Sequence, residues 1–378
     1  MNAPVNTVRG DLIRPFARKD AEAVSLLFHA LMHHARDAAP RRLAAYLGSH
    51  FIDGPFADPE IPSLVYVSDE EEVEGFVGVV VQPMVYRQKT IRAAILGTLM
   101  VKGHDRAPTI GARLLRKAVS GPQDVTLSET AGEASLAMWR QLHGTVLDRY
   151  SYDYFRVLRP VSFALAVMAR RVPWLAYATP VAQLLDRLAP RDGSRLGWTG
   201  LPGEFRTHGG VYARRVSVSD FARLTEVLLS ADAVRPVWPD GCLPALIAEA
   251  MDKPEYGAPH LCEVVTRAGH PIGGFLLHFA PGALAQVLDV LHAPGQAGPV
   301  FDAMLCYARD LGACGVRGRI TPSLFDALVS RKTPLAHAGA SVIHGKDTAL
   351  IAAFAEGRAH FNGLVGESWT RIIGGSFN

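Results

Sequence analysis

The chain lacks the features by which several protein classes are recognised. Its apolar stretches fall short of the roughly 18 to 20 residues that cross a membrane, and its four cysteines form no C-x-x-C pair. The spacing typical of a zinc site is also absent, so we expect free, reduced and mostly buried thiols. Residues 1–7 show no apolar core of a secretory signal. These absences indicate a cytoplasmic protein without a metal centre.

The chain also has no large excess of acidic or of basic residues. The chain has 39 Lys and Arg against 36 Asp and Glu, a net charge of +3, whereas nucleic-acid-binding domains usually carry clustered basic faces. We therefore expect no nucleic-acid partner. What is present is a chain of 378 residues, of which 49% are hydrophobic. That is enough for two globular domains with ordinary cores.

The most informative segment is 93–121. An apolar, strand-like run from Ala93 ends at Met100 and Val101, a short turn follows, and an amphipathic basic helix is predicted over 110–119. A glycine-containing turn at the start of a helix leaves backbone N–H groups unpaired, and the helix dipole adds positive potential there. The segment therefore predicts that an anion, here a pyrophosphate, binds at the helix N-terminus.

The turn of this segment carries a recognisable pattern, Arg106-Ala-Pro-Thr109-Ile110-Gly111-Ala112. Arg-x-x-Thr-x-Gly resembles the Arg/Gln-x-x-Gly-x-Gly/Ala signature of the GNAT superfamily of acyl-CoA N-acyltransferases, with Thr109 in place of the central glycine. The resemblance implies that acyl-CoA binds where the strand ends and the helix begins. The residues it predicts to contact acyl-CoA are Met100, Val101, Arg106, Thr109, Ile110, Gly111 and Ala112.

Two stretches of the chain, about 200 residues apart, resemble each other in the order of their predicted elements. Each has a strand, a helix, a strand hairpin, a strand, a helix, a strand and a helix, the first beginning near Leu12 and the second near Val211. This is the order of the GNAT fold. We therefore predict an α+β protein of three layers, with two tandem GNAT-like domains. Each domain has a mixed, mostly antiparallel sheet flanked by helices.

The predicted boundaries follow from this repeat. Residues 9–158 form an N-terminal GNAT domain that binds acyl-CoA and carries out catalysis, and residues 207–345 form a degenerate C-terminal GNAT-like domain. A helical linker occupies 159–206, and a tail over 346–378 is apolar enough to pack back on one domain. Pro299 removes a backbone donor from the corresponding turn of the second half, so we expect that half to bind CoA poorly or not at all.

The resemblance also implies how the reaction proceeds. In the superfamily a main-chain N–H of the central strand polarises the thioester carbonyl, a carboxylate or water removes the amine proton, and a tyrosine often protonates the thiolate. Trp139 occupies the position of that tyrosine. Glu129, which follows a predicted strand, is the candidate base, and the alternative is that it caps the next helix. Tyr86 is a candidate for the acceptor site, and the alternative is an aromatic at the sheet edge.

The function implied by the resemblance is direct transfer of an acetyl or longer acyl group from CoA to an amine, without a metal. The acceptor amine is predicted to belong to a small molecule, an amino sugar or a peptide. A homodimer is compatible with this prediction. One alternative is a non-catalytic acyl-CoA-binding or sensing protein on a GNAT fold, which Thr109 and Trp139 favour. Another is a long-chain acyltransferase in which the apolar segment 161–188 covers the acyl chain.

Overall fold

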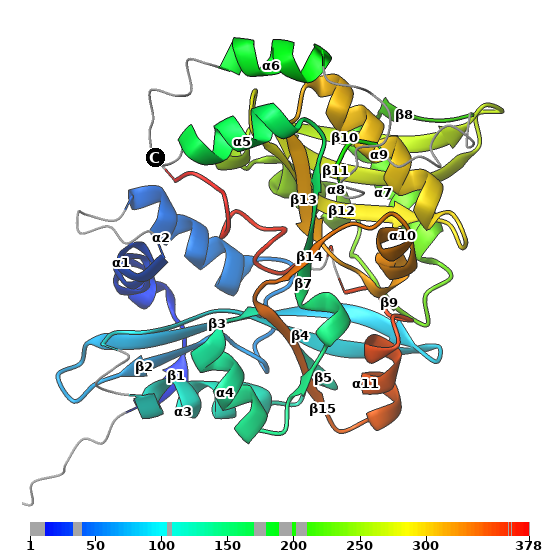
Figure 1. Ribbon diagram of the computed structural model, residues 1–378. Coiled ribbons are helices and arrows are strands. Elements are labelled where there is room, and N and C mark those ends of the chain that lie inside the picture. The colour runs from blue at the N-terminus through cyan, green and yellow to red at the C-terminus, as the bar shows by residue number, and fades with distance from the viewer. Residues whose placement is uncertain are drawn as a thin grey trace, which may run out of the picture.

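The computed structural model describes residues 12–32, 40–103, 108–169, 179–188, 199–201, 210–361, 363 and 365–377. Within these residues the chain forms two mixed sheets flanked by helices (Figure 1). The C-terminal segment 365–377, called the tail below, runs between the two sheets. The predicted α+β class, with two mixed sheets flanked by helices, is confirmed.

In the described residues the first sheet has eight strands and is antiparallel except between two central neighbours. In spatial order its strands are β1 (Leu12–Pro15), β2 (Leu64–Val67), β3 (Val73–Tyr86), β4 (Lys89–Val101), β5 (Val125–Ala131), β15 (Ala340–Gly345) and β6 (Thr145–Val146), and β9 (Val234–Pro236) pairs with the end of β3. β4 and β5 run parallel. The hairpin between β3 and β4 turns at Arg87 and Gln88, both with positive φ, as a two-residue hairpin turn requires.

The second sheet repeats this pattern, with seven strands in the part of the chain that the structure describes. In spatial order they are β14 (Leu335–His337), β7 (Tyr152–Val157), β13 (Gly315–Arg319), β12 (Leu284–His292), β11 (Pro271–Phe279), β10 (Ala258–Thr266) and β8 (Val211–Arg215). β12 and β13 run parallel, as β4 and β5 do in the first sheet. The chain order of the central strands is therefore the same in both sheets.

The two halves exchange one strand, which corrects the predicted domain boundaries. β7 falls within the predicted range 9–158 but pairs with β13 and β14 of the second sheet. β15 falls within 207–345 but lies between β5 and β6 of the first sheet. Where the two crossing segments meet, the Ser341 backbone N–H donates to the Ser151 hydroxyl at 3.0 Å. Residue alternation predicts that such a segment is a strand, but it does not determine which sheet the strand joins.

The described α-helices lie on the outer face of each sheet, between the two sheets, and in the predicted linker. α3 (Pro108–Val119) and α4 (Glu133–Gln141) cover the outer face of the first sheet, and α9 (Ala297–Leu311) and α10 (Phe325–Ser330) cover that of the second. The layer between the sheets contains α1 (Ala21–Met32), α2 (Arg41–Gly48), α7 (Val218–Leu229), α8 (Cys242–Met251) and α11 (Thr348–Ala355). α5 (Pro160–Ala169) and α6 (Thr179–Leu188) pack on each other within the predicted linker.

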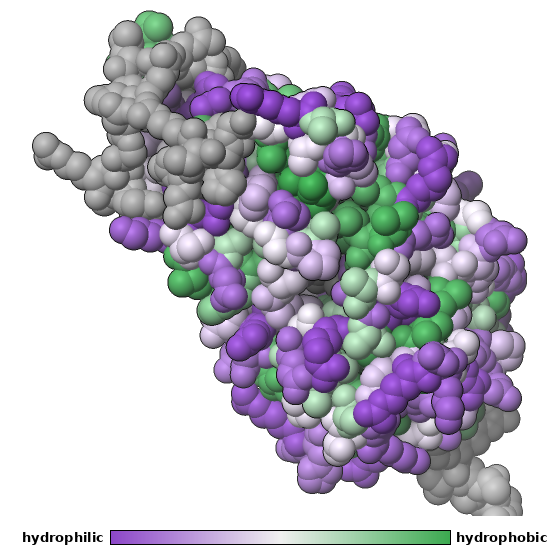
Figure 2. Space-filling model, turned by 90° about the vertical axis from the view of Figure 1, so that its right-hand side faces the viewer, coloured by the Kyte–Doolittle hydropathy of each residue, from purple (hydrophilic) through white to green (hydrophobic). Residues whose placement is uncertain are grey.

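Hydrophobic residues divide among three cores that match these layers. The largest core lies between the sheets and joins residues of both halves with the tail, for example Phe28, Leu291 and Trp369. Because this core includes residues of both sheets, the two halves bury apolar surface against each other as well as within themselves. On the face shown in Figure 2, polar residues surround smaller apolar patches, which is usual for the surface of a globular protein.

Candidate active site

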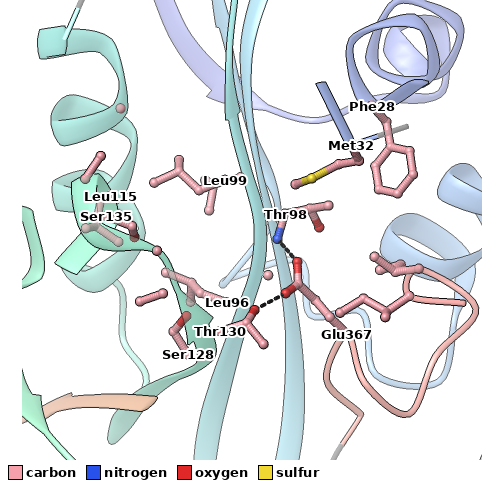
Figure 3. A pocket seen from close by; sticks show the side chains of 18 of the residues that line it. Phe28, Met32, Leu96, Thr98, Leu99, Leu115, Ser128, Thr130, Ser135 and Glu367 are labelled. Atoms are coloured by element: carbon pink, nitrogen blue, oxygen red, sulfur yellow. Dashed lines mark hydrogen bonds between the residues drawn. The ribbon is translucent and has the colours of Figure 1, made fainter. Parts of the chain in front are cut away.

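A cavity of about 610 Å³ lies where β4 and β5 separate (Figure 3). The two strands pair in parallel only from Ala93–Ile95 to Val125–Leu127 and then diverge. Beyond this split, α3 and α4 line the cavity on one side of the sheet. On the other side it is lined by α1, the short helix η6 (Pro254–Tyr256) and the tail. The cavity therefore connects the two faces of the first sheet through the gap between the strands.

β4 carries a bulge at this split. Its register with β3 shifts between Phe76 and Gly78, and Thr98 has a φ of 55°, which is uncommon for a residue other than glycine. The Thr98 backbone N–H donates to the carboxylate of Glu367 (Figure 3). A left-handed backbone of this kind persists only where its surroundings hold it, and such positions are frequent at functional sites.

Glu367 comes from the tail and bridges the two diverging strands (Figure 3). One carboxylate oxygen accepts the Thr98 N–H, and the other accepts the hydroxyl of Thr130 on β5 at 2.5 Å. A Cβ at Gly97 would lie 2.6 Å from Cγ of Glu367, so this close approach requires glycine. Burial raises the pKa of the Glu367 carboxyl group. A carboxyl group with a raised pKa can exchange a proton nearer neutral pH than an ordinary glutamate.

The tail that carries Glu367 is fixed by buried polar groups. The Lys253 ammonium, only 1% exposed, donates to the backbone carbonyls of Thr370, at 2.6 Å, and Ile373. The Arg371 backbone N–H donates to the Glu249 carboxylate at 3.1 Å. Burial lowers the pKa of Lys253 to about 8. These bonds hold the tail against α8 and the residues after it, and so set the position of Glu367 in the cavity.

Glu129, the predicted base, lies next to this site but does not line the cavity. Its Oε2 accepts the Ser368 hydroxyl at 2.8 Å, and a Cβ at Gly366 would lie within 2.4 Å of the carboxyl group, so the tail covers it. Burial raises the pKa of Glu129 to about 7, with a further contribution from the nearby Glu367. Glu129 does not cap α4, because the N-cap position is Gly132 and has no side-chain cap. The alternative interpretation, in which Glu129 caps the helix that follows it, is therefore wrong.

Two of the predicted acyl-CoA contacts, Val101 and Gly111, line the cavity. α3 begins at Pro108. Proline has no N–H group, so the N–H groups of the first helical turn that have no acceptor within the helix include those of Thr109 and Ile110. A Cβ at Gly111 would lie 3.3 Å from Sδ of Met138 on α4, so glycine allows these two helices to approach closely. Arg106 lies outside the described residues.

The side chains of the other predicted contacts point elsewhere. Ile110 is buried in the core beneath α3, and Met100 is buried on the opposite face of the sheet, in the core between the sheets. Thr109 is exposed and Ala112 is half-buried, and neither lines the cavity. A ligand at the N-terminus of α3 would therefore meet Thr109 and Ile110 through their backbone N–H groups.

Tyr86 does not lie at the site, which corrects its predicted place beside the acceptor. It pairs with Lys89 and Val234 at the far end of β3 and does not line the cavity. The Arg87 guanidinium carbon stands 4.9 Å from the centre of its ring. Tyr86 is therefore an aromatic residue at the end of the sheet. Its position at a strand end was compatible with either interpretation, because the length of the hairpin could not be read from residue alternation.

Trp139, in contrast, lines the cavity from α4 and is only 1% exposed. It occupies the place at which the GNAT resemblance implies a tyrosine. An indole N–H donates a hydrogen bond but does not release its proton near neutral pH. Trp139 therefore contributes shape and apolar surface to the cavity, and not a general acid.

The corresponding region of the second sheet is nearly filled. β12 and β13 pair from Leu284–Val287 to Gly315–Gly318, and the space beside them measures only about 80 Å³. Buried Asp289 and His360 line it, and burial raises the pKa of Asp289 to about 7 and lowers that of His360 to about 3. In the first turn of α9, a Cβ at Gly298 would lie 2.7 Å from the guanidinium of Arg331. The second half therefore offers much less room than the first.

Sequence reasoning missed the residues that reach the cavity from the inter-sheet layer. They are Phe28, Met32, Glu255, Tyr256, Glu367, Ile372, Ile373 and Gly374. None belongs to a motif, and the apolar character of the tail was the only signal that it packs on the protein. Among the described residues, no group of three or more His, Cys, Asp or Glu side chains is placed to hold a metal ion. Within the same residues, no helix combines the length and apolarity that crossing a membrane requires.

Comparison with known proteins places this geometry among solved structures. No protein-family model and no curated protein sequence matches the chain. A conserved protein of unknown function from Enterococcus faecalis V583, named a probable N-acyltransferase, matches with a TM-score of 0.52 and 9% identity, over 88% of this chain and 72% of that one. A GCN5-related N-acetyltransferase from Kribbella flavida matches with a TM-score of 0.52 and 13% identity, over 88% and 70%.

At these identities the likeness concerns the fold. It agrees with what the chain itself shows, namely a parallel strand pair that splits, a bulge at the split and a helix that follows the bulged strand. The chain has the fold of the GNAT N-acetyltransferases, present twice and with one strand exchanged between the two copies.

Proposed function

We propose that the chain is an acyl-CoA-dependent N-acyltransferase and that its reaction takes place in the cavity of the first sheet. One observation carries the proposal: the backbone N–H at the bulge of β4 and the carboxylate of Glu367 meet inside a cavity that also reaches the first turn of α3. The acyltransferase names of the two structures with this fold support it. The proposal also includes an acetyl or longer acyl group as the group transferred, an amine as the acceptor, and a cytoplasmic location.

The proposed position of acyl-CoA follows from the two ends of the cavity. The N-terminus of α3, where Gly111 lines the cavity, would bind the pyrophosphate through the backbone N–H groups of Thr109 and Ile110 and through the helix dipole. The thioester would lie in the split, where the Thr98 N–H polarises its carbonyl oxygen. The nearly filled second sheet makes the first half the preferred site.

The acceptor amine would enter from the side of α1 and the tail, which is opposite α3. Its nitrogen attacks the thioester carbon, so the C–N bond forms, the C–S bond breaks and the electron pair leaves with sulfur as a thiolate. Glu367 is the carboxylate best placed to accept the proton that the attacking nitrogen releases. The thiolate needs no strong acid, because a free thiol has a pKa of about 8.5. Trp139 is therefore compatible with turnover.

The test is an amine-dependent assay of thiol release from acetyl-CoA and longer acyl-CoA substrates. The proposal predicts release that depends on both substrates and forms an amide in equal amount. It also predicts a large decrease for Glu367→Gln. Absence of amide formation with any amine, in a protein that binds acyl-CoA, would overturn the enzyme proposal.

A non-catalytic acyl-CoA sensor is the second candidate. Two observations favour it: Trp139 lies where a proton donor is implied, and the carboxylate of Glu367 already holds the Thr98 N–H. A sensor would bind acyl-CoA and hold it without turnover. Binding without amide formation would therefore select this candidate.

A further inference from the structure

The part of the cavity that faces the acceptor has an apolar wall. Phe28 and Met32 stand one turn apart on α1 (Figure 3), and Ile372 and Ile373 of the tail line the same cavity. Phe28 and Ile372 are buried, whereas Met32 remains 44% exposed at the edge of the cavity. Because the buried residues are packed into the inter-sheet core, this wall is already formed before a ligand binds.

In the described part of the cavity lining, the charged groups are acidic. Among the described residues that line it, the charged ones are Glu133, Glu255 and Glu367, and there is no Lys, Arg or His. Glu255 and Tyr256 come from η6 and lie on the acceptor side with Glu367. A carboxylate beside an apolar wall and an aromatic ring favours a ligand that carries a cation on an apolar body.

Two other occupants fit this part of the cavity less well. A sugar carries several hydroxyl groups, and those that face the apolar wall would have no hydrogen-bond partner. A long acyl chain would match the wall, but it has no charge and would leave the carboxylates of Glu255 and Glu367 facing hydrocarbon. An ammonium group on a hydrocarbon body satisfies both features at once.

We propose that the acceptor is a primary amine on an apolar body, an alkylamine or an arylalkylamine, held by the wall of Phe28, Met32 and Ile372 with its nitrogen toward Glu367. This inference rests on the proposed acyltransferase function and adds the class of acceptor. The nitrogen then lies beside the Thr98 N–H, which is where the thioester carbonyl would be. α1 and the tail therefore determine which acceptor is used.

The test compares acceptors and one pair of variants of the full-length protein. With acetyl-CoA as donor, 2-phenylethylamine and hexylamine should give kcat/KM values at least about tenfold above those of glucosamine and of a lysine peptide, the scale of discrimination that an apolar pocket provides. Met32→Lys should lower kcat/KM for 2-phenylethylamine by a similar factor, because it places a cation at the edge of the cavity. Leu26→Lys is the matched control, since Leu26 is exposed on α1 and lies outside this cavity.

Calorimetric titration with acetyl-CoA and decanoyl-CoA separates this inference from the proposed function. Absence of acyl-CoA binding would overturn the function itself. Acyl-CoA binding with a preference for glucosamine or the peptide, or without turnover of any apolar amine, would overturn the acceptor class alone. If Met32→Lys weakened decanoyl-CoA binding and left acetyl-CoA binding intact, the wall would hold the acyl chain, and the inference would also fail.

Discussion

Glu367→Gln separates proton transfer from packing at the candidate site. Glutamine has nearly the same shape as glutamate, so its amide oxygen can still accept the Thr98 N–H and its amide nitrogen can donate to the hydroxyl oxygen of Thr130. The substitution removes the group that takes up the amine proton. We therefore expect kcat to fall by roughly 10²- to 10⁴-fold, the range for a positioned general base.

Acyl-CoA affinity should change in the opposite direction in this variant. The thioester carbonyl has to displace the carboxylate of Glu367 from the Thr98 N–H. A hydrogen bond to a charged group contributes about 1.5–3 kcal/mol and a neutral one about 0.5–1.5 kcal/mol, so the amide is easier to displace by about 1 kcal/mol. This difference corresponds to roughly fivefold tighter binding of acetyl-CoA. Free CoA has no thioester carbonyl, so its affinity should stay the same.

Steady-state kinetics and calorimetry of the same preparations measure both effects. Glu129→Gln is the matched control, because it makes the same chemical change in a carboxyl group that is buried under the tail and does not line the cavity. It should retain most of the wild-type kcat. A wild-type kcat in Glu367→Gln would refute the reasoning, and a loss confined to Glu129→Gln would establish Glu129 as the base.

Three further predictions concern stability and the position of the tail. Burial raises the pKa of Glu129 to about 7 from an ordinary value of 4.5, so the folded protein keeps a proton that the unfolded chain releases as the pH rises between these values. This group should therefore lower the free energy of unfolding by about 3 kcal/mol between pH 4.5 and 7, and urea titrations of Glu129→Gln should lack that decrease. Gly97→Ala would place a methyl group 2.6 Å from Cγ of Glu367, so kcat should fall although acetyl-CoA still binds, and an unchanged kcat would contradict the assigned position. Asp302→Asn leaves the buried guanidinium of Arg331 without its charged partner and should lower the free energy of unfolding by about 3–5 kcal/mol in denaturant titrations; a loss below about 1 kcal/mol would contradict this.

Much of the fold could be predicted because its determinants are local. The apolar run that ends at Val101, the helix start near Gly111 and the repeat of elements in the second half depend on neighbouring residues and are visible in the sequence. The exchange of β7 and β15 could not be predicted in this way. Both segments have the alternation of a strand, and their partners are set by contacts such as that between Ser341 and Ser151.

The candidate site was predicted only in part for the same reason. Val101 and Gly111 belong to a continuous motif and line the cavity, whereas Glu367 arrives from a segment more than 200 residues away in the chain. Glu129 was the predicted base because it comes at the end of the predicted strand 125–128, where its side chain could point into the cleft. The tail then covers it and places a second carboxylate in the cavity. No local pattern predicts that a distant segment will cover Glu129 and bring a carboxylate of its own, Glu367, into the cavity.

Calorimetric titration of the wild-type protein and of Gly111→Asp with acetyl-CoA tests the central claim most directly. The account predicts one equivalent bound by the wild type and none by Gly111→Asp, because the added carboxylate would stand in the first turn of α3, where the pyrophosphate is proposed to bind. Val227→Asp, which adds the same charge at an exposed position of α7, should bind as the wild type does. Undiminished binding by Gly111→Asp, or no binding by the wild type, would contradict the claim that the first half holds acyl-CoA.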